Sequence, residues 1–299
     1  MQPHSVERGQ REQRELLLPE KVREVFSPAA PTTRRDSFAG RSEQLAQILD
    51  VVAQRGQHAV VYGERGVGKT SLAAVATGGL GERRTIALRV NCDGSDNFVS
   101  IWRKVLREAQ LARPLPPVVG IRESFSEATT SAVSLLAATH VTVDIVRQAL
   151  QVLSHPAPIV IVLDEFDRLE HARAKTLFAD TIKALSDHIV LATVVVVGVA
   201  ETPGTLLGEH RSIERGLRAI HVPRMLPAEL MDIVRFGLGK LHMTIADDAV
   251  ARIAELSEGF PHYAHSLGLL ASREAIRSAQ SAVQVAHVHR VAPQVIPLG

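Results

Sequence analysis

The sequence predicts an α/β protein in which a parallel sheet is covered by helices on both faces, followed by a small all-helical domain. Up to about residue 200, short runs of apolar and β-branched residues alternate with segments whose apolar residues recur at helical spacing. This alternation favours a parallel sheet, because a helix usually forms the crossover between parallel strands. From residue 227 onward only helical patterns remain, which indicates a second domain.

The patterns assign each expected strand and helix to a residue range. Strands are expected at residues 58–62, 84–90, 159–163 and 189–199. Helices are expected at residues 12–18, from Ser42 to a stop at Gly56, and at 71–77, 97–109, 144–153, 172–185, 228–238, 247–256 and 263–279. Residues 111–140 open with prolines and are then rich in Ser, Thr and Ala, so we expect a mobile surface excursion there.

Composition excludes several classes of protein. The chain of 299 residues is 45% hydrophobic and 22% charged, which is typical of globular rather than disordered proteins. The formal net charge is only +2, so no strong overall field attracts nucleic acid or a membrane. Cys92 is the only cysteine, which excludes a disulfide framework and favours a reducing cytoplasm. The longest apolar run, residues 189–200, is too short to span a bilayer.

The strongest motif is the glycine-rich turn GERGVGKT at residues 63–70, which matches the pattern G-x-x-x-x-G-K-[ST]. It lies between an expected strand and an expected helix, where backbone N–H groups and a helix N-terminus bind phosphate. We therefore expect Lys69 to contact the β- and γ-phosphates and the Thr70 hydroxyl to bind Mg²⁺. The nucleotide-binding residues expected in this turn are Gly63, Glu64, Arg65, Gly66, Val67, Gly68, Lys69, Thr70 and Ser71.

Two acidic residues directly follow the expected strand at 159–163. Asp164 and Glu165 would lie at the carboxyl edge of the sheet, where open α/β sheets bind ligands. We expect Asp164 to bind Mg²⁺, usually through water, and Glu165 to orient and deprotonate the attacking water. The alternative is that the two acids cap the following helix. The chain has no N-K-x-D motif of the kind that recognises guanine, which favours ATP as the nucleotide.

These motifs resemble those of the AAA+ P-loop ATPases, in particular the clade of origin-recognition and Cdc-type initiators. The related STAND regulatory ATPases are also similar at the start of this region. The similarity begins at Phe38-Ala39-Gly40-Arg41, continues through the phosphate loop (Walker A) and the Asp164–Glu165 pair (Walker B), and extends to residue 277. It implies that the backbone around Phe38, Gly40 and Arg41 packs against adenine.

The resemblance also implies roles for residues that follow the last expected strand. The strand at 194–199 is similar to the one that carries sensor 1, and Glu201 or Thr202 would have to serve as its polar tip. The segment 211–215 resembles the one that gives an arginine finger to a neighbouring subunit. It implies that Arg215 acts as a catalytic charge donor in trans, with Arg211 as the lesser candidate.

In the helical domain the chain departs from the family pattern. His262 stands where the family carries the sensor 2 arginine, so contact with the γ-phosphate would be weaker. Residues after 279 are too few for the winged-helix DNA-binding domain of the initiators, which makes origin binding of that kind unexpected. We expect an N-terminal arm at 1–36, a nucleotide-binding domain at 37–225, a helical lid at 226–280 and a tail at 281–299.

The expected function is Mg²⁺-dependent ATP hydrolysis that couples the nucleotide state to lid motion. One reading is a cytoplasmic motor or loader that assembles with further copies or remodels a partner. Another is a STAND-type switch with slow or no turnover. A transposition-type ATPase that selects target DNA is a weaker third reading, because the arginines do not form a basic stripe. DNA binding is therefore possible but not supported by the charge, and no membrane partner is expected.

Overall fold

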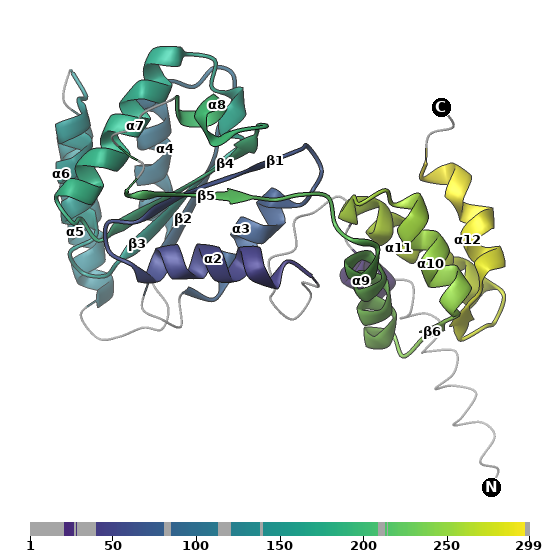
Figure 1. Ribbon diagram of the computed structural model, residues 1–299. Coiled ribbons are helices and arrows are strands. Elements are labelled where there is room, and N and C mark those ends of the chain that lie inside the picture. Colours follow the sequence, from purple (N-terminus) through teal and green to yellow (C-terminus); the bar gives the residue numbers. More distant parts are fainter. Residues whose placement is uncertain are drawn as a thin grey trace, which may run out of the picture. The chain divides into compact units, whose positions relative to one another are not determined.

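The computed structural model describes residues 21–26, 28, 40–80, 85–112, 121–137, 140–208, 213 and 215–296 (Figure 1). Contacts within the chain divide it into two units. The α/β unit comprises residues 42–65 and 69–223. The described residues of the helical unit are 21–26, 28, 40–41, residues 66–68 of the phosphate loop, and 224–296.

Five parallel strands form the sheet of the α/β unit, in the order β2-β3-β4-β1-β5. They are β1 (His58–Gly63), β2 (Ile86–Asn91), β3 (Ile159–Asp164), β4 (Ala192–Val199) and β5 (Leu217–His221). The central strands are apolar and buried along almost their whole length, as in sheets that are covered on both faces. The predicted α/β fold class is confirmed.

Helices cover both faces of this sheet. Figure 1 shows α4 and α7 on one side of the strands and α2 and α3 on the other. Helix α5 packs against α4 and α6, and α6 packs against α7. The helices of the unit are α2 (Ser42–Ala53), α3 (Lys69–Gly78), α4 (Phe98–Leu111), α5 (Ile121–Leu136), α6 (Val143–Leu153), α7 (Ala172–Asp187) and α8 (Pro203–Leu207).

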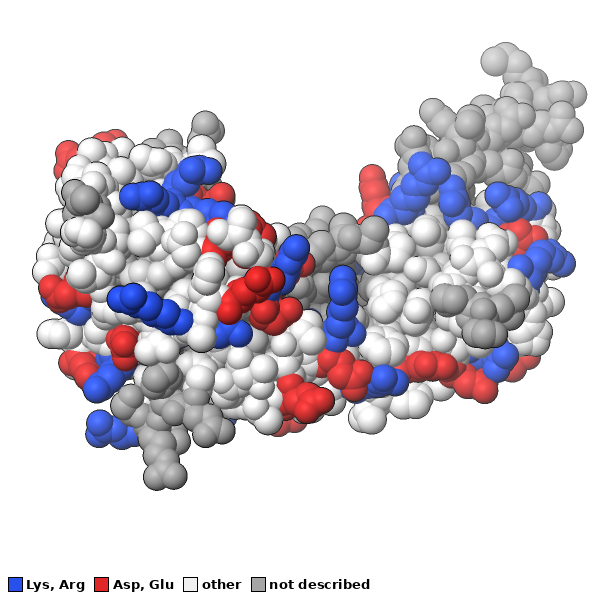
Figure 2. All heavy atoms as spheres, turned by 90° about the horizontal axis from the view of Figure 1, so that it is seen from above, with Lys and Arg blue, Asp and Glu red and all other residues white. Residues whose placement is uncertain are grey.

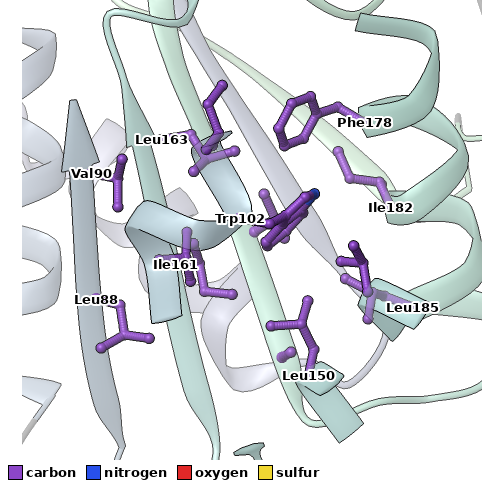
Figure 3. Close-up of a cluster of buried hydrophobic side chains, with 14 of the residues drawn as sticks. Leu88, Val90, Trp102, Leu150, Ile161, Leu163, Phe178, Ile182 and Leu185 are labelled. Atoms are coloured by element: carbon purple, nitrogen blue, oxygen red, sulfur yellow. The ribbon is translucent and has the colours of Figure 1, made fainter. Parts of the chain in front are cut away.

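The larger hydrophobic core lies between the sheet and helices α4, α6 and α7. Side chains alternate along β2, so Leu88 and Val90 enter this core while Arg89 between them faces the other way. Trp102 of α4 is 1% exposed and stacks on Phe178 of α7 with 5.4 Å between ring centroids. Figure 3 shows these side chains together above the strands. This packing fixes the strand ends that carry the candidate site.

Two elements of the α/β unit differ from the sequence-based expectation. The mobile excursion expected at 111–140 is wrong for the described part, because α5 forms there and buries Phe125, Ala132 and Leu136. Small Ala and Thr residues make up much of its packed face, so its helical period is weak in the sequence. The edge strand β5 was not expected, because three of its five residues are exposed and its apolar pattern is broken.

Four helices of the helical unit pack around a second core. They are α9 (Pro227–Lys240), α10 (Asp247–Leu256), α11 (Pro261–Arg277) and α12 (Val285–Val291). Two short strands, β6 (Thr244–Ile245) and β7 (Ala282–Val283), pair in parallel. The described part of 281–299 is therefore not a tail, since Val283, Val288 and Val291 are buried in this core.

The N-terminal segment contributes to the same core. Residues 21–25 are helical, and Val22 and Phe26 are almost fully buried. The Phe26 ring lies against Gly237 of α9 and Gly268 of α11, where the missing side chains leave room for it. The helix expected at 12–18 lies outside the described residues. None of the helices in the described ranges is long and apolar enough to cross a membrane.

Candidate nucleotide-binding site

The glycine-rich turn joins the carboxyl end of β1 to the start of α3. Gly63 ends the strand with φ +149°, and a Cβ at this position would collide with the carbonyl oxygen of Val222. Gly66 has φ +84°, a conformation that L side chains rarely adopt. Helix α3 then begins at Lys69, so its first N–H groups face the turn. This is the geometry that binds phosphate.

Lys69 is folded back into the turn that precedes it. Its Nζ donates hydrogen bonds to the carbonyl oxygens of Gly63 at 3.0 Å and Glu64 at 2.6 Å. The residue is only 7% exposed. The ammonium group therefore lies within the curve of the turn, and a phosphate held by the turn would meet a positive charge there.

Thr70 and Asp164 come together at the carboxyl edge of the sheet. The Thr70 hydroxyl donates a hydrogen bond to Oδ1 of Asp164 at 3.1 Å, and the N–H of Glu165 donates to the same oxygen at 2.9 Å. Asp164 is 2% exposed. A hydroxyl beside a carboxylate offers the oxygen ligands that Mg²⁺ prefers, with phosphate and water completing its shell. The residues present therefore fit a Mg²⁺ ion bound together with a nucleotide.

Arg89 is a residue of this site that the sequence analysis missed. Its Nη2 lies 2.7 Å from Oδ2 of Asp164, the carboxylate oxygen that Thr70 does not use. The only sequence signal was an arginine at an alternate position of an apolar strand. Its partner depends on the register between β2 and β3, which the sequence did not reveal.

Glu165 has the backbone conformation of a strained residue. Its φ of 54° and ψ of 35° are left-handed, which costs on the order of 1 kcal/mol for a residue with a Cβ. Its carboxylate is about half exposed and pairs with Arg168 at 3.1 Å. No side-chain hydrogen bond of Glu165 caps the short helix that follows, Phe166–Arg168. The geometry therefore does not support the capping alternative for Glu165.

Asp167 connects the ends of two neighbouring strands. Its Oδ1 accepts a hydrogen bond from the N–H of Val199, the last residue of β4, at 2.8 Å. Beyond this strand, Thr202 forms a local hydrogen bond with Thr205 at 3.1 Å, and Glu201 is exposed. Neither of the two sensor 1 candidates contacts Asp164 or Glu165 through a hydrogen bond described here.

The segment that precedes α2 is held by Arg41. The Arg41 Nη2 donates to the carbonyl oxygen of Val67 at 3.0 Å, and its backbone N–H donates to Oε1 of Glu229 at 3.0 Å. Burial lowers the pKa of the Arg41 guanidinium, and the nearby Glu229 carboxylate opposes that shift. Gly40 packs tightly, because a Cβ there would lie 2.7 Å from the Met225 methyl carbon. Phe38 lies outside the described residues.

His262 lies at the start of α11, next to the part of the phosphate loop that groups with the helical unit. A Cβ built on Gly66 would lie 3.3 Å from the Cε1 of His262. The His262 ring also packs on Tyr263 with 4.1 Å between ring centroids. His262 thus lies beside Gly66 of the loop, with an imidazole where the family resemblance predicts a guanidinium.

Arg215 lies at the amino-terminal end of the strands, whereas the phosphate loop lies at their carboxyl end. It precedes β5, which runs parallel to β1, and its carbonyl oxygen accepts a hydrogen bond from Gln57 at 2.9 Å. β1 spans six residues, so about 17 Å of strand separates this end from the loop. Arg215 therefore cannot reach a nucleotide on its own chain, and only a role in trans is open to it. Arg211 lies outside the described residues.

Comparison with known families identifies the fold that carries this site. The family described as the AAA ATPase domain matches residues 37–197, more than half of the chain. The chain belongs to the AAA ATPase family. Comparison of this AAA ATPase with curated protein sequences finds no match.

Solved structures with the same fold share little sequence with this AAA ATPase. The Walker-type ATPase PABY2304 of Pyrococcus abyssi is 15% identical with a TM-score of 0.61, over 91% of this chain and 75% of that chain. The ORC1 protein of Aeropyrum pernix, solved in complex with DNA, is 19% identical with a TM-score of 0.58, over 87% and 66%. RuvB of Thermotoga maritima, a Holliday junction branch migration motor, is 16% identical with a TM-score of 0.52, over 89% and 73%.

Proposed function

We propose that this AAA ATPase binds Mg·ATP at the phosphate loop and hydrolyses it, coupling the nucleotide state to motion of the helical unit. Assembly with further copies, or remodelling of a protein partner, is the proposed output. The observation that carries the proposal is the Thr70–Asp164 hydrogen bond of 3.1 Å, made beside a lysine that is folded into the phosphate loop. Family membership independently supports a nucleotide-dependent ATPase activity.

Each residue of the site has a defined task in this proposal. Lys69 and the loop N–H groups hold the β- and γ-phosphates, while Thr70 and Asp164 hold Mg²⁺. The bound ion would neutralise charge on the phosphates and orient them. Glu165 stands next to Asp164 on the exposed side, where it can accept a proton from the attacking water. Arg168 pairs with only one oxygen of this carboxylate, Oε2.

Charge stabilisation in trans is the part of the proposal that requires a second chain. Arg215 is exposed at the sheet edge far from its own phosphate loop. On a neighbouring copy it could approach the γ-phosphate and stabilise the transition state. Full activity would then require self-association, which leads to the homo-oligomer that we propose.

A STAND-type regulatory switch is the second candidate function. It is favoured by the ion pair that holds Glu165 to Arg168 and by the histidine at position 262 in place of an arginine. Both features would slow hydrolysis without preventing nucleotide binding. In that case ATP binding alone would expose a surface for a partner.

The formal net charge of +2 gives no reason to propose a nucleic acid partner. Figure 2 shows basic and acidic side chains intermixed over the face in view, without a continuous basic surface there. Nucleic acid binding depends on such surfaces, because the phosphate backbone supplies most of the affinity. We therefore favour a protein partner or a second copy.

The proposal is tested by measuring binding of a fluorescent ATP analogue, mant-ATP, and steady-state ATP turnover with the same set of variants. Lys69→Ala should weaken mant-ATP binding by at least about 10-fold, because it removes the charge that meets the phosphates. Glu165→Gln should bind mant-ATP normally but lose roughly 10²-fold or more in turnover. Glu170→Gln is the matched control, since Glu170 is exposed five residues further along the same loop.

Three outcomes separate the candidates. Binding with measurable turnover that Glu165→Gln abolishes supports the ATPase. Binding with negligible turnover in the unmodified protein supports the switch. Absence of mant-ATP binding in the unmodified protein, with and without Mg²⁺, would sink both.

A further inference from the structure

Asp164 is engaged by three donors within the α/β unit. Oδ1 accepts hydrogen bonds from the Thr70 hydroxyl and from the N–H of Glu165, and Oδ2 pairs with Nη2 of Arg89 at 2.7 Å. The Asp164 side chain is 3% exposed and that of Arg89 is 30% exposed. The Asp164 carboxylate is therefore paired with the guanidinium of Arg89.

Strand register explains why these two residues meet. β2 and β3 pair in parallel, with Arg89 opposite Val162 and Asn91 opposite Asp164. Residues two apart on a strand share a face, so Arg89 and Asp164 are diagonal neighbours on one side of the sheet. The opposite side of β2 carries the core residues Leu88 and Val90. Arg89 is thus fixed at its backbone, and only its side chain can change partner.

The Arg89 guanidinium and a Mg²⁺ ion are both cations, and they would compete for the Asp164 carboxylate. An arginine remains protonated at any pH at which the protein folds, so its charge cannot be removed. A positive charge beside the carboxylate opposes the approach of a divalent cation, since like charges repel strongly where water is scarce.

Arg89 borders an open pocket beside the edge strand β2. The pocket has a volume of about 530 Å³, and Lys104, Arg107 and Glu108 of α4 line it as well. Glu108 offers a second carboxylate in that pocket. The pocket is thus polar, and a guanidinium that leaves Asp164 would meet Glu108 there but also the two cations Lys104 and Arg107.

We propose that Arg89 is a positioning residue that competes with Mg²⁺ for Asp164. Its guanidinium holds the carboxylate while the site is free of metal and swings into the pocket when Mg·ATP binds. Arg89 thereby sets the Mg²⁺ concentration at which the site loads. This inference rests on the proposed function, because it assumes that the site takes a nucleotide with Mg²⁺.

The test is a Mg²⁺ titration of the full-length protein with mant-ATP bound, followed by the fluorescence of the nucleotide. Arg89→Met should lower the Mg²⁺ concentration at half-saturation by roughly 3- to 10-fold, because a competing charge is removed. Arg89→Lys keeps a cation at the position and should stay close to the unmodified protein. Arg218→Met is the matched control, since Arg218 is an exposed arginine of β5, the opposite edge strand.

Two results would overturn the proposal. An unchanged half-saturation in Arg89→Met means that the ion pair does not act on the metal. A higher half-saturation means that Arg89 helps Asp164 to bind the ion rather than competing with it.

A second measurement needs no nucleotide and separates this proposal from the proposed function. The melting temperature of nucleotide-free protein is compared in EDTA and in excess Mg²⁺. In EDTA, Arg89→Met should have a lower melting temperature than Arg218→Met, because Asp164 loses its cation. Addition of Mg²⁺ should then raise the melting temperature of Arg89→Met by more than it raises that of the unmodified protein. An equal response to Mg²⁺ in both proteins contradicts the competition, even if mant-ATP binding is absent.

Discussion

His58 is a buried histidine whose environment keeps it neutral. It begins β1, and its Nδ1 accepts a hydrogen bond from the N–H of Val194 in the neighbouring strand at 3.0 Å. Burial lowers the pKa of His58 to about 4. His265 in the helical unit is neutral for the same reason, because burial lowers its pKa to about 4 as well. Each imidazole therefore takes up a proton less readily in the folded protein than in the unfolded chain.

This predicts a loss of stability in mild acid. The folded pKa lies below the unfolded value of about 6.5, so the stabilisation is complete above pH 6.5 and declines as the pH falls toward 4. Between pH 7 and pH 5, His58 alone should cost about 2 kcal/mol of unfolding free energy. Urea denaturation at the two pH values measures the loss.

His58→Asn retains an acceptor near the Nδ1 position and removes the titration. Its loss of stability between pH 7 and pH 5 should be smaller by about 2 kcal/mol than that of the unmodified protein. His140→Asn, an exposed histidine in a loop, should leave the difference unchanged. An identical pH dependence in His58→Asn would show that His58 does not titrate in this range.

At the residue scale, the sequence predicted those contacts that a local motif specifies. Lys69 and Thr70 belong to one turn whose spacing is readable directly, and Asp164 follows a clear strand. Arg89 and Arg168 were missed as partners of Asp164 and Glu165. The Arg89–Asp164 pair depends on strand register, and the Arg168–Glu165 pair depends on the left-handed turn at Glu165. Neither feature leaves a periodic pattern in the sequence.

At the scale of elements, the N-terminal segment and two helices share one close contact. A Cβ on Gly237 of α9 would lie 2.5 Å from the ring of Phe26, and one on Gly268 of α11 would lie 2.8 Å from it. Phe26 is 1% exposed and also meets His265 edge-on with 6.1 Å between ring centroids. The two glycines therefore create the space in which the segment docks.

Gly237→Ala should destabilise the protein although alanine favours helices. The added methyl group forces the buried ring to shift, at a cost of roughly 1–3 kcal/mol for overpacking. Gly239→Ala on the same helix is the matched control, because a Cβ there meets nothing within 4 Å. It should stabilise the protein by about 0.5–1 kcal/mol. Chemical denaturation distinguishes the opposite signs, and equal effects would contradict the tight fit of Phe26.

The elements that the sequence missed are those with a weak apolar signal. Helix α5 buries alanine and threonine beside Phe125, and β5 has only one fully buried residue, Ile220. By contrast β3 and β4 are continuous apolar runs and were predicted to within three residues. Packing against neighbours, rather than intrinsic pattern, determines the structure of α5 and β5.

At the scale of the whole molecule, Arg215 and the phosphate loop lie at opposite ends of the parallel strands of one sheet. Arg215 is therefore too far from the phosphate loop of its own chain to contact a nucleotide there, and the proposed catalytic role requires a second chain. If active sites are shared in this way, ATP turnover per chain rises with protein concentration until assembly is complete. A monomeric switch would show a flat dependence.

Arg215→Ala should remove that rise and lower turnover at high concentration by at least about 10²-fold, as loss of an arginine finger does. Mant-ATP binding should be unaffected. Arg103→Ala, an exposed arginine of α4, serves as the control. Turnover that stays concentration-dependent and undiminished in Arg215→Ala would show that another group provides the charge.

Arg41 joins three segments that are distant in the sequence. Its guanidinium bonds to the Val67 carbonyl, and its N–H bonds to Glu229, whose other carboxylate oxygen accepts from the N–H of Leu226 just before α9. None of these segments can open without breaking a hydrogen bond that another also uses. Opening of the phosphate loop and fraying of α9 therefore each break one of the two hydrogen bonds that hold Arg41, and a phosphate bound to the loop would raise the free energy of the first of these openings.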